Sequence, residues 1–156
     1  MGQVINRRNI AAFVKKLHDA RKTVVITNGC FDILHVGHVR YLQKTKSFAD
    51  YLLVLMNSDI SVKKIKGEGR PINNESDRAE ILTALGCVDF VVIFDEDSPA
   101  QLIDEIKPDV YTKGADYTME NLPERDIMIK NNIRVEFVDF VDGKSTTNII
   151  NKIENT

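Results

Sequence analysis

The sequence has little of what marks a disulfide-stapled, membrane-spanning or secreted chain. Only two cysteines occur in its 156 residues, Cys30 and Cys87, and they lie in separate motifs, which argues against a disulfide framework. No apolar run approaches the roughly 20 residues that a membrane-spanning helix needs. The N-terminus also lacks the charged and then apolar order of a secretion signal. The cytoplasm is therefore the expected compartment.

Neither sign of charge dominates the chain. Its 21 lysines and arginines against 23 aspartates and glutamates leave a net charge of −2, which argues against nucleic acid or a membrane surface as a partner. A hydrophobic content of 43% with 28% charged residues is ordinary for a soluble globular protein. The length suits one domain over residues 1–156, and no linker or low-complexity break interrupts it.

Strands and helices are expected to alternate along the chain. Apolar and β-branched runs predict five buried strands at residues 23–27, 51–57, 88–94, 110–113 and 134–141. Helical spacing and start signals predict helices that begin near residues 9, 36, 74, 99, 123 and 145. The segment Ser98-Pro-Ala-Gln101 has the form of a capping box, and Ile81, Leu82 and Leu85 form the expected inward face of their helix. The alternation predicts a single Rossmann-like α/β domain, with a five-stranded parallel sheet and helices on both faces.

The segment from Thr27 to His38, Thr-Asn-Gly-Cys-Phe-Asp-Ile-Leu-His-Val-Gly-His, lies where the first predicted strand becomes a helix. Ligands of open parallel sheets bind beyond the carboxyl ends of the strands, and the free N–H groups of a helix start attract anions. His35 and His38 add two imidazoles that can donate hydrogen bonds to a phosphate whose charge grows during reaction. The segment therefore predicts a phosphate site.

Other interpretations of the two histidines stay open at this point. A His-x-x-His pair is common by chance, and either ring can be a satisfied structural group. Cys30, Asp32, His35 and His38 are all potential metal ligands. Their spacing fits no zinc pattern, however, and no second Cys/His cluster follows, so no protein-held metal is expected.

A basic segment follows the second predicted strand. Residues 62–71, Val-Lys-Lys-Ile-Lys-Gly-Glu-Gly-Arg-Pro, hold four cations and two glycines and are expected to form a mobile arm. Lys66 and Arg70 are the candidates for closing over phosphate. Arg78, on the next helix, either binds phosphate or only pairs with Glu75 or Asp77.

Two later strand ends are also followed by polar residues. In residues 112–117, Thr-Lys-Gly-Ala-Asp-Tyr, Gly114 lets the backbone approach a planar base, while Lys113 and Asp116 offer a donor and an acceptor. In residues 142–147, Asp-Gly-Lys-Ser-Thr-Thr, three hydroxyls at a helix start form either an ordinary cap or a site for the outer phosphates of a nucleotide.

In combination these motifs resemble the nucleotidyltransferase superfamily that is marked by His-x-Gly-His and a late Ser-Thr-Thr helix start. The resemblance is closest to the heptose-1-phosphate adenylyltransferases, which make ADP-heptose for bacterial surface glycans. The shared motifs are residues 27–38, 57–59, 66–67, 70–71, 113–117 and 142–150. In many members of that family the domain is fused to a sugar kinase, and from the length we expect a stand-alone form here. The similar glycerol-3-phosphate cytidylyltransferases have an arginine five residues before the Ser-Thr-Thr serine, where this chain has Phe140.

The resemblance implies transfer of AMP from ATP to D-glycero-D-manno-heptose 1-phosphate, with release of pyrophosphate, for lipopolysaccharide or S-layer glycan synthesis. It implies catalytic roles for His35, His38 and Lys66 and substrate binding by Asp32, Arg70 and Arg78. The residues implied to bind the nucleotide are Gly29, Cys30, Phe31, Gly37, Lys113, Gly114, Asp116, Ser145, Thr146 and Thr147. Mg²⁺ is expected to bind mainly through nucleotide phosphates, and a homodimer is the expected assembly.

Two alternatives remain open. One is a different enzyme of the same architecture, either a glycerol-3-phosphate-type cytidylyltransferase or a FAD-synthase-type adenylyltransferase. The other is a non-catalytic nucleotide-binding module, which would bind a nucleotide without releasing pyrophosphate.

Overall fold

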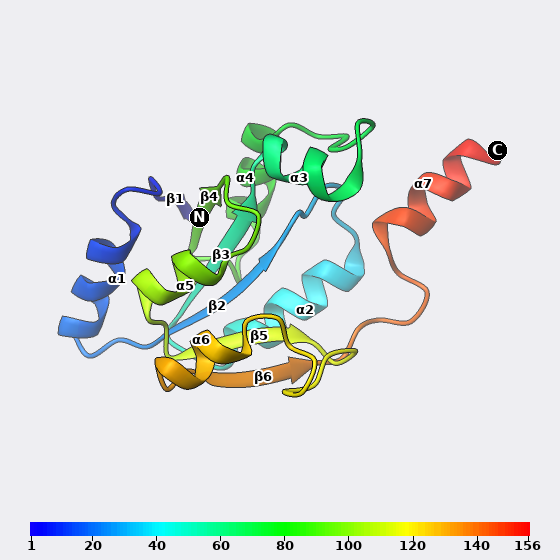
Figure 1. Ribbon diagram of the computed structural model, residues 1–156. Coiled ribbons are helices and arrows are strands. Elements are labelled where there is room, and N and C mark those ends of the chain that lie inside the picture. The colour runs from blue at the N-terminus through cyan, green and yellow to red at the C-terminus, as the bar shows by residue number, and fades with distance from the viewer.

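A parallel sheet of six strands forms the centre of the computed structural model, which describes residues 1–156 (Figure 1). The strands are β1 (Gln3–Val4), β2 (Val24–Gly29), β3 (Tyr51–Asn57), β4 (Phe90–Phe94), β5 (Val110–Gly114) and β6 (Arg134–Val138). Their order is β1-β4-β3-β2-β5-β6, and every neighbouring pair is parallel. The helices are α1 (Ile10–Asp19), α2 (Val36–Lys46), α3 (Asp59–Lys66), α4 (Glu75–Ala84), α5 (Ala100–Ile106), α6 (Arg125–Lys130) and α7 (Thr146–Glu154).

Alternate residues of the central strands feed two cores, one on each face of the sheet. Ile26 of β2 and Leu53 of β3 pack with residues of α1, α5 and α6, whereas Val25 and Leu52 pack with residues of α2 and α4. Successive side chains of a strand point to opposite faces, so a strand that is covered on both sides must be apolar throughout. This requirement explains the unbroken apolar run of β3, and the predicted α/β architecture with helices on both faces is confirmed.

The strand count differs from the predicted five because of β1. Gln3 and Val4 pair with Phe90 and Val91 of β4 at the edge of the sheet. This strand is two residues long and both of its residues are exposed. It therefore has no buried apolar pattern from which the sequence could have revealed it.

The basic segment is not simply a mobile arm, because its first half is helical. The Ser58 hydroxyl accepts a hydrogen bond from the N–H of Ser61 and caps α3, which continues to Lys66. Lys63 and Lys64 form ion pairs on the exposed side of this helix. The loop between α3 and α4 begins only after Lys66.

Some smaller expectations also fail. Ile81 is 44% exposed, since the inward face of α4 is formed by Arg78, Ala79 and Leu82 instead. Ser98 does not cap α5 through a capping box, because Pro99 itself is the N-cap residue and the Gln101 side chain bonds within its own helix. The third and fifth predicted strands are shorter than expected, at Phe90–Phe94 and Arg134–Val138.

The topology gives the sheet a natural binding position at the end of β2. This strand pairs with β3 on one side and with β5 on the other, so the order of connection reverses beside it. Ligands of doubly wound sheets bind in the crevice that such a reversal opens. Helix α7 stands clear of the sheet, beyond the carboxyl ends of its strands, and buries none of its residues (Figure 1).

None of the helices has the length and apolar character to span a membrane.

Candidate active site

A cavity of about 560 Å³ lies at the carboxyl edge of the sheet, around the end of β2. The loops after β2, β3, β5 and β6 and the end of α3 all contribute to its walls. Of the sequence-predicted site residues, all except Arg78 and Asp116 line this cavity. Lining residues outside the predicted set are Asn28, Tyr41, Asn57, Ile65, Tyr117, Phe140, Val141 and Lys144.

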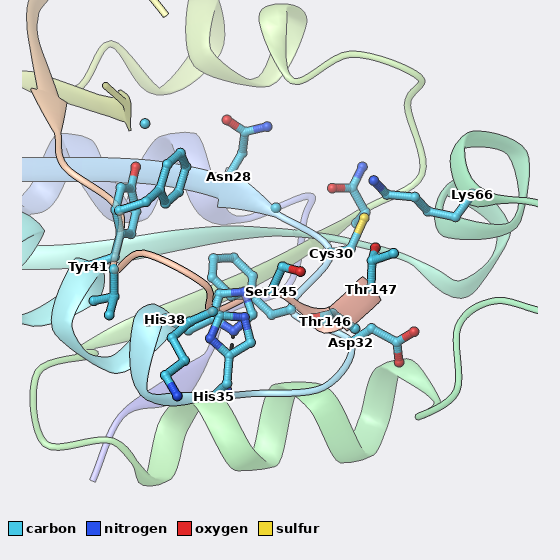
Figure 2. A pocket seen from close by; sticks show the side chains of 18 of the residues that line it. Asn28, Cys30, Asp32, His35, His38, Tyr41, Lys66, Ser145, Thr146 and Thr147 are labelled. Carbon is cyan, nitrogen blue, oxygen red and sulfur yellow. Dashed lines mark hydrogen bonds between the residues drawn. The ribbon is translucent and has the colours of Figure 1, made fainter. Parts of the chain in front are cut away.

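The two histidine rings lie side by side at the start of α2 (Figure 2). Their centroids are 3.9 Å apart, and His35 is the N-cap residue of the helix. The backbone N–H of His35 donates to Nδ1 of His38 at 3.4 Å. Neutral His38 must therefore hold its proton on Nε2, which is left as a donor. The first amides of α2 add further unpaired donors at this position.

Both imidazoles are neutral at pH 7. Burial and the nearby His35 lower the pKa of His38 from 6.5 to about 4. Burial, and then the charge of Lys144, lower the pKa of His35. Its Nδ1 is buried and has no hydrogen-bond partner within the protein. The neutral rings do not repel the nearby Lys144 ammonium, and each still has one N–H that can donate a hydrogen bond to an anion.

A buried hydroxyl network fixes α2 against the sheet. The Tyr41 hydroxyl lies 3.0 Å from Oγ1 of Thr27 and donates to Oγ1 of Thr112 at 3.2 Å, while Thr45 completes the set at 3.1 Å from Thr112. These residues come from β2, β5 and α2. Tyr41 lies three residues after His38, so it shares the helix face of that histidine, and this spacing is the signal that could have identified it.

Arg78 is buried, and the structure gives it a structural role. Its guanidinium donates to the carbonyl oxygens of Cys30 at 2.6 Å, Asn57 at 2.9 Å and Asn73 at 3.0 Å, and to the Asp59 carboxylate at 2.7 Å. Only 1% of its surface is exposed, and it does not line the cavity. The predicted contact with an acceptor phosphate is therefore absent from this arrangement. Arg78 instead joins the ends of β2 and β3 to the loop before α4.

Asp32 and Arg70 form a second anchor, at the wall of the cavity. The Asp32 carboxylate accepts from Nε of Arg70 at 2.6 Å and from the backbone N–H groups of Ile72 and Asn73, each at 2.9 Å. Burial raises the pKa of Asp32, but these hydrogen bonds outweigh that effect and hold the pKa below its ordinary value. The terminal nitrogens of Arg70 make no hydrogen bond and remain available to a ligand.

The start of α7 lies against the histidine loop. Oγ1 of Thr146 donates to the carbonyl oxygen of Ile33 at 3.1 Å, and the Ser145 hydroxyl caps the helix by accepting the N–H of Asn148 at 3.0 Å. Thr146 thus donates its hydroxyl hydrogen to the protein, whereas Ser145 only accepts and keeps its own O–H to donate. The O–H groups of Ser145 and Thr147 and the first amides of the helix donate to no protein group, and they are the donors left for a ligand.

The Phe140 ring lies against Gly114, the last residue of β5. A side chain at Gly114 would put a Cβ 2.1 Å from Cζ of Phe140 and 2.6 Å from an oxygen of Asp116, so any larger residue would displace the Phe140 ring from this position. The Phe140 ring also stacks on Tyr41, with centroids 6.0 Å apart. Asp116 is exposed beside this loop but does not line the cavity.

The buried carboxylate of Glu124 pairs with Lys113, which lines the cavity. The Lys113 ammonium lies 3.7 Å from Oε1 of Glu124 and donates to the Tyr111 hydroxyl at 3.2 Å. That hydroxyl in turn donates to Oδ1 of Asn28 at 2.7 Å, so the amide NH₂ of Asn28 is free to donate elsewhere. Glu124 precedes a short helix far from any motif, and nothing in the sequence signalled it.

The model of the family described as cytidylyltransferase-like matches residues 26–152, which include every part of the cavity. The chain belongs to the cytidylyltransferase-like family. The chain is similar to proteins named "Bifunctional protein HldE", including one from Geobacter metallireducens, 52% identical over 97% of this chain, and one from Campylobacter fetus, 58% identical over 85%.

The chain spans only about a third of those two relatives, 31% and 28% of their lengths. Among solved structures, the lipopolysaccharide core biosynthesis protein from Thermoplasma volcanium has a TM-score of 0.62 and 31% sequence identity. The match covers 79% of this chain and 99% of that one. As a member of the cytidylyltransferase-like family, the protein is a nucleotidyltransferase.

Proposed function

We propose that the protein transfers AMP from ATP to D-glycero-D-manno-heptose 1-phosphate and releases pyrophosphate. The observation that carries this proposal is the meeting of two helix starts in one cavity, that of α2 with His35 and His38 and that of α7 with Thr147. Both helix starts present unpaired N–H groups to an anion. The HldE relatives and the lipopolysaccharide core relative support a sugar phosphate as the acceptor.

The chemistry follows from the charges present. A phosphate oxygen of the heptose 1-phosphate attacks the α-phosphorus, a new P–O bond forms, and the bond to the β-phosphate oxygen breaks as pyrophosphate leaves. The nucleophile is already an anion, so the site needs no strong general base. Rate enhancement then depends on alignment and on donors that stabilise the charge growing on the α-phosphate. Neutral His38, with a proton on Nε2, is suited to that task.

Other groups of the cavity have complementary parts in this scheme. Lys66 enters from the end of α3 and forms no ion pair, which leaves its charge for the phosphates (Figure 2). The terminal nitrogens of Arg70 suit the acceptor phosphate, in the place of Arg78. Lys113 and the Gly114 backbone flank the base.

Mg²⁺ would enter with ATP and be held mainly through phosphate oxygens. No group of three or more histidine, cysteine, aspartate or glutamate side chains lies close enough together to form a metal site. The ion would supply charge neutralisation on the phosphates and leaving pyrophosphate. We further propose that the protein acts in the cytoplasm, as its sequence composition favours, and that it is a homodimer, as the family resemblance implies.

The test is pyrophosphate release with Mg²⁺. ATP, CTP and GTP should be compared, each with both anomers of the heptose 1-phosphate and with glycerol 3-phosphate. Activity with ATP and one heptose anomer alone supports the proposal and assigns the anomer. Turnover of CTP with glycerol phosphate would replace it with the polyol cytidylyltransferase alternative. Nucleotide binding without any pyrophosphate release would favour a non-catalytic module.

A further inference from the structure

The cationic side chains of the cavity differ in how far their charge is already neutralised. Four of them line it: Lys66, Arg70, Lys113 and Lys144. Arg70 lies 2.6 Å from the Asp32 carboxylate, and Lys113 lies 3.7 Å from that of Glu124. Lys66 and Lys144 form no ion pair and donate no hydrogen bond to the protein. The positive charges of these two lysines are therefore not neutralised by a carboxylate and are available to a polyphosphate.

Lys144 lies just before α7 and beside the histidine loop, whereas Lys66 is the last residue of α3. The Cβ of Lys144 is 3.3 Å from the position that a Cβ on Gly37 would take, so its backbone packs directly on the start of α2. After burial, its charge is the second cause that lowers the pKa of His35, whereas the charge of Lys66 partly offsets the burial that raises the pKa of Cys30. The two lysines thus reach one cavity from two different segments of the chain, the end of α3 and the loop before α7.

The local backbone explains this placement. Gly143 has φ of +70°, a conformation that favours glycine, and it turns the chain just before Lys144. Ser145 then caps α7, and Thr146 ties the helix to the carbonyl of Ile33. The lysine is therefore held between two helix starts that both attract anions.

We propose that Lys144 binds the β- and γ-phosphates of the nucleotide and accompanies them as they become pyrophosphate. This inference rests on the proposed function in taking a nucleoside triphosphate as the ligand. A cation beside the two neutral imidazoles is placed to stabilise the negative charge that develops on the leaving group as its bond to the α-phosphorus breaks. Lys66 and Lys144 together then grip the polyphosphate from two sides.

The experiment is calorimetric titration of Lys144→Met with Mg-ATP, AMP and pyrophosphate. Loss of a charged hydrogen bond should weaken binding of ATP and pyrophosphate about ten- to hundredfold. Binding of AMP should change less than about threefold, because AMP lacks the phosphates that Lys144 contacts. Lys144→Arg should retain most of the affinity for ATP.

Lys152→Met is the matched control, since Lys152 is an exposed lysine of α7 that forms no ion pair and lies outside the cavity. It should leave all three affinities unchanged. In Lys144→Met the pKa of His35, followed by NMR, should rise, because the ammonium that lowers it is gone. A purely structural role for Lys144 would not separate ATP from AMP in this way.

Unchanged ATP affinity, or equal losses for ATP and AMP, would overturn the role of Lys144. A wild-type protein that binds no ATP would overturn both this inference and the proposed function. If the wild type binds ATP with the expected dependence on Lys144 but turns over no heptose phosphate, only the choice of acceptor falls. If the wild type turns over heptose phosphate and Lys144→Met binds ATP as tightly as the wild type does, the proposed function stands and this inference is refuted.

Discussion

Replacement of Asp32 by alanine tests whether this carboxylate is a structural anchor or a ligand of the sugar. In the structure it is 3% exposed and accepts from Arg70, Ile72 and Asn73. A hydrogen bond to a charged group contributes about 1.5–3 kcal/mol, and loss of one partner from a buried ion pair costs about 3–5 kcal/mol. Arg70 keeps an 18% exposed side chain, so water can replace part of the loss. We expect the free energy of unfolding to fall by about 3 kcal/mol.

The assay is urea unfolding at pH 7, followed by circular dichroism. Asp95→Ala is the control, because Asp95 is exposed and makes no hydrogen bond or ion pair. Its unfolding free energy should stay within about 0.5 kcal/mol of the wild type. Pyrophosphate release by the folded fraction of Asp32→Ala should fall mainly through a raised KM, since Arg70 and the loop before α4 lose their anchor.

A loss of stability below about 1 kcal/mol, together with a large drop in kcat, would refute this reasoning. Asp32 would then act on the substrate, as the sequence first indicated, and the hydrogen bonds to Ile72 and Asn73 would be of minor energetic importance.

The remaining predictions concern the histidines and the buried arginine. His35→Ala and His38→Ala should each reduce kcat about 10²–10³-fold, the scale for loss of one donor to a developing negative charge; losses within threefold in steady-state assays would remove both rings from the mechanism. The pKa of His38, about 4 against 6.5 when unperturbed, means that the unfolded chain takes up the proton first. Stability is therefore full above pH 6.5 and declines as the pH falls toward 4, by at most about 3 kcal/mol, and His38→Gln should flatten this part of the unfolding profile. Arg78→Met should lower the unfolding free energy by about 3–5 kcal/mol in urea titrations, because three carbonyl oxygens and Asp59 lose their donor; a change below about 1 kcal/mol would show that the buried guanidinium does not hold the strand ends together.

Local patterns determined the α/β class and most of the cavity. The apolar run of β3 and the helical spacing after His38 depend on which faces are buried, and such periodicity is written directly in the sequence. The cavity could be anticipated because parallel strands end at one edge, so polar residues after β2, β5 and β6 must lie near each other. Edge strand β1 was not predicted, because its two exposed residues show no hydrophobic periodicity.

Tertiary structure alone decided which polar side chains face the ligand and which are used by the protein itself. Arg78 and Arg70 are indistinguishable as charges in a sequence, yet one is buried among carbonyl oxygens and the other keeps its terminal nitrogens free. The same holds for Thr146 and Thr147, since Thr146 donates its hydroxyl to the carbonyl of Ile33 and Thr147 has no such partner. A side chain's partners come from segments far away in the chain, so its hydrogen bonds are settled only when those segments pack. The sequence by itself therefore determined the location of the site, at the carboxyl ends of the strands, and the packing determined which of its side chains remain free to bind a ligand.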